Sequence, residues 1–305
     1  MAIGNFDGVH LGHRAVIGAA LAEARESGLR PLVLTFDPHP SEVLGRGAPA
    51  PLTLPARKVL LIERLGADLR VVVEPFTTAL SKLTPAEFAR DFVVKVLGAR
   101  VVIVGENFHF GHGRAGDLDT LVALGRELGF AAHASSLVGD ASGPYSSTRA
   151  RVALGAGDLA AVANVLGRPH SISGSVVLGA QRGRTSGVPT ANLDGVGEAL
   201  PPHGVYAVLV DQEVDGVARA LSTGVANIGV RPTVSAGFGV EVHLFDFSGD
   251  LYGSRLRVHL IERLRDERKF SGLDELKAQI AQDMTGARRA LLGLRAEPGA
   301  GGAWR

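Results

Sequence analysis

The sequence predicts an α/β unit built on a parallel sheet, followed by an antiparallel β barrel or sandwich that closes with a helix. Three observations support this fold class. First, the chain has 305 residues, which favours two domains of roughly 100 to 200 residues each. Second, short apolar runs alternate with helical patterns from residue 29 to residue 136, as in repeated βαβ units. Third, valine-rich runs between residues 171 and 265 are separated by glycine turns instead of helices.

The composition narrows the function classes. Lysine and arginine number 32, and aspartate and glutamate number 31, so the bulk charge does not favour a nucleic acid or an anionic membrane as the partner. The absence of cysteine excludes disulfides, thiolate metal sites and cysteine nucleophiles. No signal-peptide pattern opens the sequence, and no apolar run approaches the roughly 18 residues of a membrane span. We therefore expect a cytoplasmic protein without nucleic-acid or membrane partners, and oligomerisation is left open.

The elements of the first unit follow in order. An apolar stripe predicts a helix after residues 4–13, with Gly28 placed to end it; the stripe comprises Val16, Ile17, Ala20, Leu21 and Ala24. Strands are predicted at 31–36, 69–73, 100–104 and 131–135, and helices at 57–65, 84–97 and 118–128. The helix at 84 has the clearest start, because Thr84-Pro-Ala-Glu87 combines a capping hydroxyl, an early proline and a returning carboxylate.

The second unit is predicted to begin near residue 169. Two short helical patterns end at Gly167, after which strands are predicted at 172–178, 204–210, 217–223, 239–245 and 256–261. A final amphipathic helix covers 273–292, and the residues after it show no periodicity. We therefore expect domains at 1–168 and 169–294 and a disordered tail at 295–305.

Polar residues follow the predicted strands of the first unit, at 7–13, 37–40 and 105–111. In open parallel sheets the ligand crevice lies at the carboxyl ends of the strands, so these segments are expected to line it. His10 and His13 stand three apart at a helix entrance, where both imidazoles reach one phosphate and Gly12 lets it approach the backbone. The alternative is that each histidine is a helix cap or a surface residue.

Two further segments suit phosphate or metal chemistry. Ser146-Ser-Thr-Arg-Ala-Arg151 offers hydroxyls and two guanidiniums for a polyphosphate, or simply caps a helix. The glycine-rich segment 179–192 is either a phosphate loop, although it lacks the Gly-Lys-Ser/Thr ending of a P-loop, or a long hairpin. Within it, Thr190 and Asn192 present neutral oxygens two residues apart, which suits a Mg²⁺ ion held partly by nucleotide phosphates.

The predicted strand at 239–245 alternates in character. One face carries Val240, Val242 and Leu244, and the other carries Glu241, His243 and Phe245. Glu241 is a candidate general base beside an aromatic ring, or else a solvated residue of an edge strand. His109 and His112 are residue types that ligate zinc, but the chain has no cysteine to complete such a site.

Six segments occur in the order found in bacterial bifunctional riboflavin kinase/FMN adenylyltransferases, also called FAD synthetases. They are Gly4-Asn-Phe-Asp-Gly-Val-His-Leu-Gly-His13, Gly105-Glu-Asn-Phe-His-Phe-Gly111, Ser146-Ser-Thr-Arg-Ala-Arg151, Gly187-Val-Pro-Thr-Ala-Asn192, Asn227-Ile-Gly-Val-Arg-Pro-Thr233 and Asp250-Leu-Tyr-Gly253. The sequence resembles that family from its first residue to residue 292. One motif alone is weak evidence, whereas six in order across two units are specific.

The resemblance implies a Rossmann-like nucleotidyltransferase domain followed by an antiparallel Greek-key flavokinase barrel with a C-terminal helix. In the barrel, the ribityl hydroxyl of riboflavin would attack the γ-phosphorus of ATP to give FMN. In the first domain, the FMN phosphate would attack the α-phosphorus of ATP to give FAD and pyrophosphate. The implied substrates are riboflavin, FMN and ATP, with Mg²⁺ accompanying ATP, and the protein mainly supplies positioning and charge.

The resemblance also assigns residues. His10 and His13 would steady the transferring phosphorus, and Glu241 would be the catalytic base of the kinase. The other implied contacts are Asn107 and Arg231 for the flavin, Thr190 and Asn192 for magnesium and, for the nucleotide, Phe6, Asp7, Gly12, Ser146, Ser147, Thr148, Arg151, Gly179, Gly183, Thr190 and Asn192.

Three features depart from the family pattern. Only Met1-Ala-Ile3 precede Gly4, where the family carries a longer segment and a full first strand. His109 and His112 stand where arginine or lysine is common, and Val234 stands where phenylalanine is favoured. We expect the last two departures to act on flavin affinity and to leave the catalytic roles unchanged.

The short start leaves one alternative open, a riboflavin kinase whose N-terminal site is impaired. A second alternative is a flavin-binding regulatory or carrier module with decayed catalysis. The presence of His10, His13 and Glu241, together with Thr190 and Asn192, argues against that second alternative.

Overall fold

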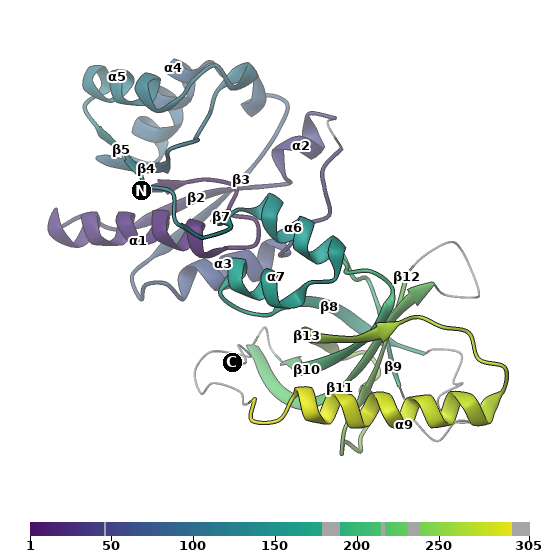
Figure 1. Ribbon diagram of the computed structural model, residues 1–305. Helices are drawn as coiled ribbons and strands as arrows, with labels where there is room; N and C mark the ends of the chain where they lie inside the picture. Colours follow the sequence, from purple (N-terminus) through teal and green to yellow (C-terminus); the bar gives the residue numbers. More distant parts are fainter. Residues whose placement is uncertain (46, 179–189, 215–216, 231–237, 295–305) are drawn as a thin grey trace. The chain divides into compact units, whose positions relative to one another are not determined.

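The fold is taken from a computed structural model that describes residues 1–45, 47–178, 190–214, 217–230 and 238–294. The chain divides into two compact units (Figure 1). The first comprises Met1–Pro49 and Thr53–Ser147, and the second comprises Ala50–Leu52 and Thr148–Arg305. The predictions that lie outside the described residues concern Gly179, Gly183, Arg231, Val234 and the tail 295–305.

In the described part of the first unit, a five-stranded parallel sheet has the order β3-β2-β1-β4-β5. Its strands are β1 (Ala2–Ile3), β2 (Leu32–Asp37), β3 (Arg70–Pro75), β4 (Val101–Gly105) and β5 (Ala131–Ser135). The chain runs outward from the central strand β1 through β2 to β3. It then crosses back and adds β4 and β5 on the other side of β1. The carboxyl ends of β1 and β4 therefore flank the point where the strand order reverses, which is where open α/β sheets bind ligands.

Strand β1 is only two residues long, yet it is the central strand. Ala2 pairs with β2 on one side and with Ile103 of β4 on the other. Ala2 and Ile3 are both buried, and the Met1 carbonyl accepts a hydrogen bond from the Ile103 N–H at 2.8 Å. The segment ahead of Gly4 is short, but it joins the two halves of the sheet.

Helices cover both faces of this sheet (Figure 1). The remaining elements of the unit are α1 (Leu11–Glu26), α2 (Pro40–Val43), α3 (Pro55–Glu63), η1 (Leu80–Lys82), α4 (Pro85–Glu87), η2 (Phe88–Val96), η3 (His112–Arg114), α5 (Leu118–Leu128), β6 (Gly139–Asp140) and β7 (Gly143–Pro144). Helices α1 and α3 bury Ile17 and Ile62 in one apolar cluster, whereas η2 and α5 bury Val93 and Leu121 in another. The sheet is thus a layer between two helical layers, and its strand ends are left for ligands.

Local signals account for where two helices start and stop. The predicted stripe of α1 is buried at Val16, Ile17, Ala20 and Ala24, and Gly28 adopts φ 63° just after the helix. The predicted capping box is also present, because Thr84 Oγ1 accepts from the Glu87 N–H at 3.2 Å while the Glu87 carboxylate accepts from the Thr84 N–H at 2.8 Å. The helix that follows is α-helical only over α4 and continues as the π-helix η2.

In the second unit, strands β8 to β13 close into an antiparallel barrel of order β10-β11-β12-β9-β8-β13. Helices α6 (Ser147–Ala156) and α7 (Leu159–Leu166) precede it, and the strands are β8 (His170–Val177), β9 (Ala191–Asp194), β10 (Gly204–Val214), β11 (Val217–Val230), β12 (Phe238–Leu244) and β13 (Arg255–Asp266). Strand β9 lies beside β12 instead of β10, which is a Greek-key arrangement. The predicted fold class is confirmed for both units.

Alternation along the strands separates an apolar barrel interior from an outer face. Val240, Val242 and Leu244 are all buried, at 2%, 0% and 7% exposure, which confirms that they share one face of β12, as predicted. Glu241 is exposed on the outer face. Phe245 follows the strand on that outer side but is buried at 2% exposure, because a helix covers it.

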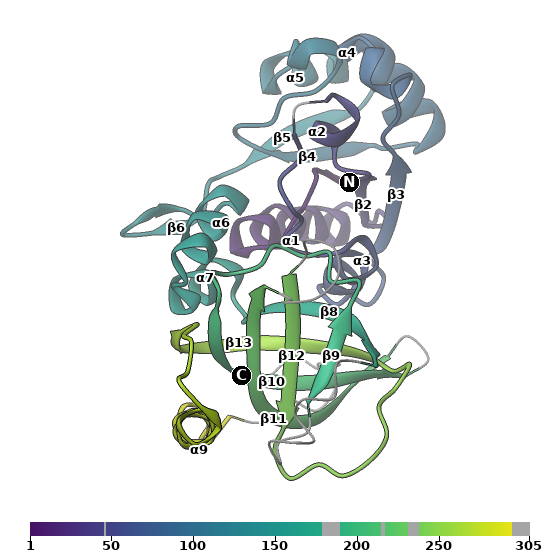
Figure 2. The same cartoon turned by 90° about the vertical axis from the view of Figure 1, so that its right-hand side faces the viewer.

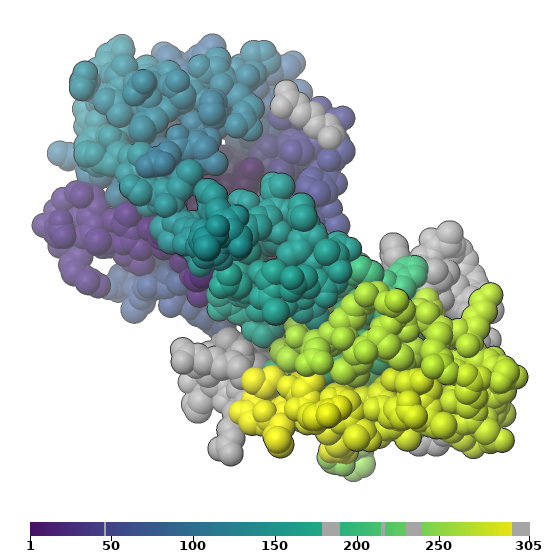
Figure 3. All heavy atoms as spheres, in the orientation of Figure 1, coloured from purple at the N-terminus to yellow at the C-terminus, as the bar shows by residue number. Residues whose placement is uncertain are grey.

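That helix is α9 (Leu273–Ala290), which Figure 2 shows end-on beside the barrel. Ala287 and Leu291 form an apolar cluster with Leu209 and Phe245. The guanidinium of Arg288 lies 4.3 Å from the centre of the Phe245 ring. The opposite side of α9 forms part of the surface of this unit (Figure 3). No helix in the described part of the chain is long and apolar enough to cross a membrane.

Several barrel strands run past their predicted ends, and two strands differ most from the sequence-based expectation. Strand β9 occupies residues that we expected to end a glycine-rich loop, and it pairs antiparallel with β8. Strand β11 extends to Val230, well past the predicted end at residue 223. Cross-strand pairing on both sides of β11 explains its length, since β10 and β12 both hydrogen-bond to it.

Candidate active sites

The segment between β1 and α1 has an unusual backbone. Phe6 and Val9 have φ values of 50° and 41°, and Gly8 has 83°. A positive φ is uncommon outside glycine and is an outlier for a β-branched residue such as valine, at a cost of about 1–3 kcal/mol per residue. Phe6 and Val9 are nevertheless buried, at 2% and 1% exposure. The surrounding structure therefore holds this segment, residues 4–10, which we call the corner.

Three side chains from three different elements hold the corner by its carbonyl oxygens. Thr35 of β2 donates its hydroxyl to the Asn5 carbonyl at 3.0 Å, and Lys58 of α3 donates to the same oxygen at 3.2 Å. Ser147, the first residue of α6, donates its hydroxyl to the Asp7 carbonyl at 2.8 Å. These hydrogen bonds to the carbonyl groups hold the corner in a backbone conformation whose positive φ values are unfavourable.

Two predicted nucleotide-binding residues of the corner also take part in its packing. Asp7 is 7% exposed, and its Oδ1 accepts a hydrogen bond from the Thr53 N–H at 3.1 Å. The ring of Phe6 stands edge-on to the imidazole of His13, with the ring centres 5.2 Å apart. Asp7 and Phe6 therefore contribute to the packing of the corner next to the histidines.

His10 and His13 stack on each other at the start of α1. Their ring centres are 3.4 Å apart and their planes are inclined by 24°. His10 is the N-cap of the helix, and its Nδ1 accepts a hydrogen bond from the His13 N–H at 3.2 Å. With Nδ1 acting as the acceptor, the proton of a neutral His10 ring lies on Nε2. A phosphate would then be contacted through Nε2 while Nδ1 caps the helix, so the capping alternative does not exclude the phosphate role.

Gly12 has a packing reason as well as a predicted binding one. A Cβ atom at Gly12 would lie 2.9 Å from the Tyr145 carbonyl oxygen and 3.1 Å from the His10 ring. Only glycine therefore lets residue 145 come this close to the start of α1. Ser146 follows directly in the sequence and is half-buried, and Ser147 reaches the corner as described above. The start of the predicted phosphate segment 146–151 thus lies beside the segment that carries His10 and His13.

The rest of the segment 146–151 continues along α6. Thr148 is exposed, and Arg151 is half-buried with its Nε donating to the Ala50 carbonyl at 3.3 Å. Both residues belong to the second unit by its contacts. Ser147 is itself the first helical residue and its hydroxyl donates to the corner, so Ser147 is not the cap of α6. Capping by Ser146, the residue before the helix, stays a prediction.

Asn107 lies in the turn after β4, across the strand-order reversal from the corner, and is exposed. His109 Nδ1 is 3.0 Å from the Asn107 carbonyl, and His112 Nδ1 is 3.2 Å from the Ser81 carbonyl. Each ring therefore uses one nitrogen on the backbone. Among the described residues, no group of three or more His, Cys, Asp or Glu side chains is placed to hold a metal ion.

Two predicted residues of the barrel, Glu241 and Asn192, lie in one row on its outer face. Glu241 of β12 is the in-register partner of Asn192 of β9 on one side and of Asn227 of β11 on the other. In-register residues of neighbouring strands carry their side chains on the same face, about 4.5–5.5 Å apart at Cβ. Strand β12 lies inside a closed barrel, so the alternative that Glu241 belongs to an edge strand is wrong, although the side chain is exposed.

The chemistry of this row fits a Mg²⁺ ion. Such an ion takes oxygen ligands and is usually bound by one or two protein groups together with substrate phosphates and water. Asn192 offers an amide oxygen on the outer face, and Thr190, just before the strand, is half-buried and offers a hydroxyl. Glu241, the in-register partner of Asn192, adds a carboxylate on the same face.

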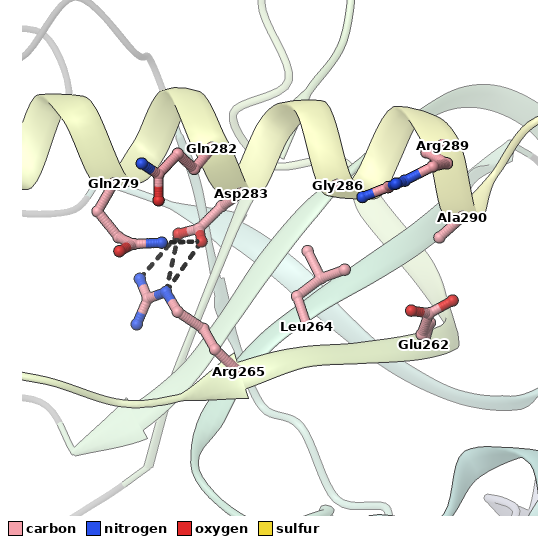
Figure 4. Close-up of a pocket in the computed structure, with 9 residues that line it drawn as sticks. All are labelled: Glu262, Leu264, Arg265, Gln279, Gln282, Asp283, Gly286, Arg289 and Ala290. Atoms are coloured by element: carbon pink, nitrogen blue, oxygen red, sulfur yellow. Dashed lines mark hydrogen bonds and ion pairs between the residues drawn. The ribbon is translucent and has the colours of Figure 1, made fainter.

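The row continues toward a cleft on the same face. Val205 of β10 is the partner of Asn227 on one side and of Arg265 on the other. Arg265 lies at one end of a cleft of about 550 Å³ between β13 and α9, and its guanidinium binds the Asp283 carboxylate with contacts of 2.8 to 3.0 Å (Figure 4). Gly286 lies in the middle of the α9 wall of this cleft (Figure 4).

Sequence reasoning missed two of the residues just described. Lys58 belongs to no sequence motif. It is identified only by its two hydrogen bonds, one to the corner and one to the end of β2. Asn227 begins one of the segments that carry the family resemblance, but its place beside Glu241 depends on strand register. The alternation of apolar and polar residues in β11 and β12 predicts that Asn227 and Glu241 both point away from the apolar face. It does not predict that the two residues are cross-strand partners.

Each unit thus carries its own set of residues suited to phosphate groups, which defines a two-domain phosphate-transferring enzyme. Comparison with protein families agrees with this class, because residues 1–149 match the FAD synthetase model and residues 166–291 match the riboflavin kinase model. The chain belongs to the family of bifunctional riboflavin kinase/FMN adenylyltransferases.

Individual relatives match over nearly the whole chain. The bifunctional riboflavin kinase/FMN adenylyltransferase of Escherichia coli strain K12 is 42% identical, covering 94% of this chain and 91% of the relative. The protein of the same name from Bacillus subtilis strain 168 is 39% identical, covering 97% and 93%. A crystal structure titled as a macrolide-efflux protein from Streptococcus pneumoniae superimposes with a TM-score of 0.82 at 30% identity, covering 94% and 93%.

Proposed function

We propose that this chain phosphorylates riboflavin to FMN with one ATP and adenylylates FMN to FAD with a second ATP. The observation that carries the proposal is that both family models match, together with 42% identity to a bifunctional relative across 94% of the chain. A chain that works only as a kinase is less well supported, because the FAD synthetase model matches from residue 1. The short strand β1 also has partners on both sides.

We assign the two reactions to domains at 1–168 and 169–294. The FAD synthetase model matches residues 1–149, inside the first domain, and the riboflavin kinase model matches residues 166–291, which begin just ahead of the proposed boundary. Both reactions consume ATP, which supports a location in the ATP-rich cytoplasm. The substrates are then riboflavin, FMN and ATP, and Mg²⁺ enters with ATP.

In the first domain, an oxygen of the FMN phosphate attacks the α-phosphorus of ATP and pyrophosphate leaves. We assign His10 and His13 to the negative charge that grows on the phosphoryl oxygens in the transition state. Their position at the N-terminus of α1 supports this role, because the helix dipole favours an anion there. His10 donates through Nε2, since its Nδ1 is used by the His13 N–H.

The other predicted residues of the first domain are assigned to the outer phosphates of ATP and to the flavin. We assign the outer phosphates of ATP to Ser146, Ser147, Thr148 and Arg151, and the position of Ser147 against the corner supports this assignment. We assign Asn107 to the flavin side, which its exposed place after β4 supports. A ligand at the strand-order reversal would then meet both the corner and Asn107.

In the barrel, the ribityl hydroxyl of riboflavin attacks the γ-phosphorus of ATP. We assign Glu241 as the base that takes the hydroxyl proton, a role supported by its exposure and by the amide groups on both sides of it. Thr190 and Asn192 would hold Mg²⁺, which offsets phosphate charge when bound. Asn227 is placed to orient the Glu241 carboxylate or the hydroxyl that it activates.

One incubation separates this function from its alternatives. The protein is mixed with riboflavin and Mg-ATP, and riboflavin, FMN and FAD are resolved by chromatography over time. We expect FMN to appear first and FAD to follow. FMN without FAD would favour the kinase-only alternative, and the absence of both would contradict the enzymatic function.

A further inference from the structure

We infer that Lys58 is a positioning residue for FMN adenylylation, because its buried ammonium group holds the corner, which ends at His10 and leads into the helix that carries His13. The inference rests on the adenylyltransferase function proposed for the first unit. It adds a residue of α3, which is distant in sequence from the two predicted phosphate segments 4–13 and 146–151.

The contacts of Lys58 join two strand ends. Its Nζ donates to the Asn5 carbonyl at 3.2 Å and to the Phe36 carbonyl at 3.0 Å. Asn5 lies in the corner after β1, and Phe36 lies at the carboxyl end of β2. One side chain therefore ties the corner to the neighbouring strand, at the edge of the sheet where ligands bind.

Stability alone does not explain a charged group at this position. Lys58 is 6% exposed, and burial lowers the pKa of its ammonium group, while the carboxylates of Asp7 and Asp37 act in the opposite direction. Buried charged groups are weak evidence for stability, because replacing a whole buried ion pair by apolar side chains of similar volume is often neutral or stabilising, whereas removing one partner alone leaves the others uncompensated. The lysine is better explained by the strength of its bonds, because charge-assisted hydrogen bonds are roughly twice as strong as neutral ones.

The corner needs such bonds. The Asn5 carbonyl, which accepts from both Lys58 and Thr35, immediately precedes Phe6 with its φ of 50°. If the carbonyl were released, the peptide would turn toward a more favourable conformation, and the start of α1 would shift with it. A displacement of about 1 Å at a reacting centre can reduce a rate by about 100-fold.

The chain offers a matched set of variants. Lys58→Met keeps the length of the side chain and removes the charge, whereas Lys58→Arg keeps the charge. Thr35→Val removes the second donor to the Asn5 carbonyl with little change in volume, and the double variant Lys58→Met/Thr35→Val completes a cycle. Lys95→Met serves as the control, because Lys95 is an exposed lysine that pairs with Asp91 on η2.

For each variant, kcat and KM are measured for FAD formation from FMN and Mg-ATP, and FMN formation from riboflavin is measured in the same preparation. We expect Lys58→Met to lower kcat for FAD formation by about 10- to 100-fold, with FMN formation within about twofold of the wild type. We expect Lys58→Arg to restore part of kcat. The double variant should lose less than the product of the two single losses, since both donors act on one carbonyl.

The outcomes distinguish the inference from the function on which it rests. A wild-type protein that makes no FAD contradicts the proposed function. A wild-type protein that makes FAD at the same kcat as a folded Lys58→Met variant overturns the inference alone. If thermal unfolding shows that Lys58→Met does not fold in the first unit, Lys58→Arg and Thr35→Val decide, and wild-type kcat in both overturns the inference.

Discussion

Glu241 of β12 and Asn192 of β9 are in-register partners on the outer face of the barrel. This pairing places a carboxylate beside an amide oxygen, although the two residues lie 49 positions apart in the chain. A base and a magnesium ligand that act on one γ-phosphate, the roles proposed for these two residues, must lie this close to act together. The relationship therefore gives separate predictions for the two residues.

The first prediction concerns the base. Glu241→Gln keeps the size of the side chain and removes its ability to accept the hydroxyl proton, so FMN formation should fall by about 10²- to 10⁴-fold. FAD formation from supplied FMN should continue at the wild-type rate. Steady-state assays of both half-reactions check this, and a loss of both in a folded protein would mean that the two sites are not separate.

The second prediction concerns magnesium. Asn192→Ala removes an amide oxygen from the row, so a higher Mg²⁺ concentration should be needed for half-maximal FMN formation. The Mg²⁺ dependence of FAD formation should stay unchanged. Titration of Mg²⁺ at fixed total ATP checks both curves, and an unshifted curve for FMN formation would leave Asn192 without a role at the metal.

The third prediction concerns the stacked histidines. His13→Ala removes a donor at the start of α1, and we expect FAD formation to fall by about 10²- to 10³-fold, as for other single donors to a charged transition state. FMN formation should not change. His133→Ala is the matched control, because His133 is an exposed histidine of β5 in the same unit. Equal rates for both variants would reduce His13 to a structural residue.

The fourth prediction concerns stability and pH. Glu198 is 5% exposed, its Oε1 accepts from the Ser173 hydroxyl at 2.9 Å, and its Oε2 has no hydrogen-bond partner among the described residues. Burial raises the pKa of Glu198 above its ordinary 4.5. The folded state therefore holds this proton to higher pH than the unfolded state does, and the contribution to stability falls as pH rises above 4.5.

We accordingly expect Glu198→Gln to gain stability relative to the wild type as the pH rises from 4.5 toward neutrality. Urea unfolding of both proteins, followed by circular dichroism at several pH values, checks the sign. Glu275→Gln is a useful comparison, because the Ser271 N–H lowers the pKa of Glu275 and reverses the expected direction. A difference between Glu198→Gln and wild type that does not vary with pH would contradict the prediction.

Much of the fold follows from local sequence signals. The capping box at Thr84 and the bounds of α5 were predicted because a helix start depends on a few neighbouring residues. The apolar stripe of α1 and the alternation in β12 were predicted because burial follows helix and strand periods. Local signals of this kind do not depend on the rest of the chain.

The remainder depends on contacts between distant segments. Lys58 matters only because α3 packs beneath the corner, and Asn227 only because β11 pairs with β12 in one register. The short strand β9 is recognised by its partners β8 and β12, not by its four residues. The roles of the site residues came from a family resemblance, and assays such as those above are needed to test them.

The cap at His10 sets a limit on how stable the first unit can become. Serine and aspartate are better N-caps than most residues, so a sequence selected for helix stability alone would carry one of them here. Neither offers a second ring nitrogen to a phosphate. If His10 has the role proposed above, a substitution that strengthens the helix leaves a protein that stops at FMN, and FAD synthesis depends on a residue that is not the best helix cap.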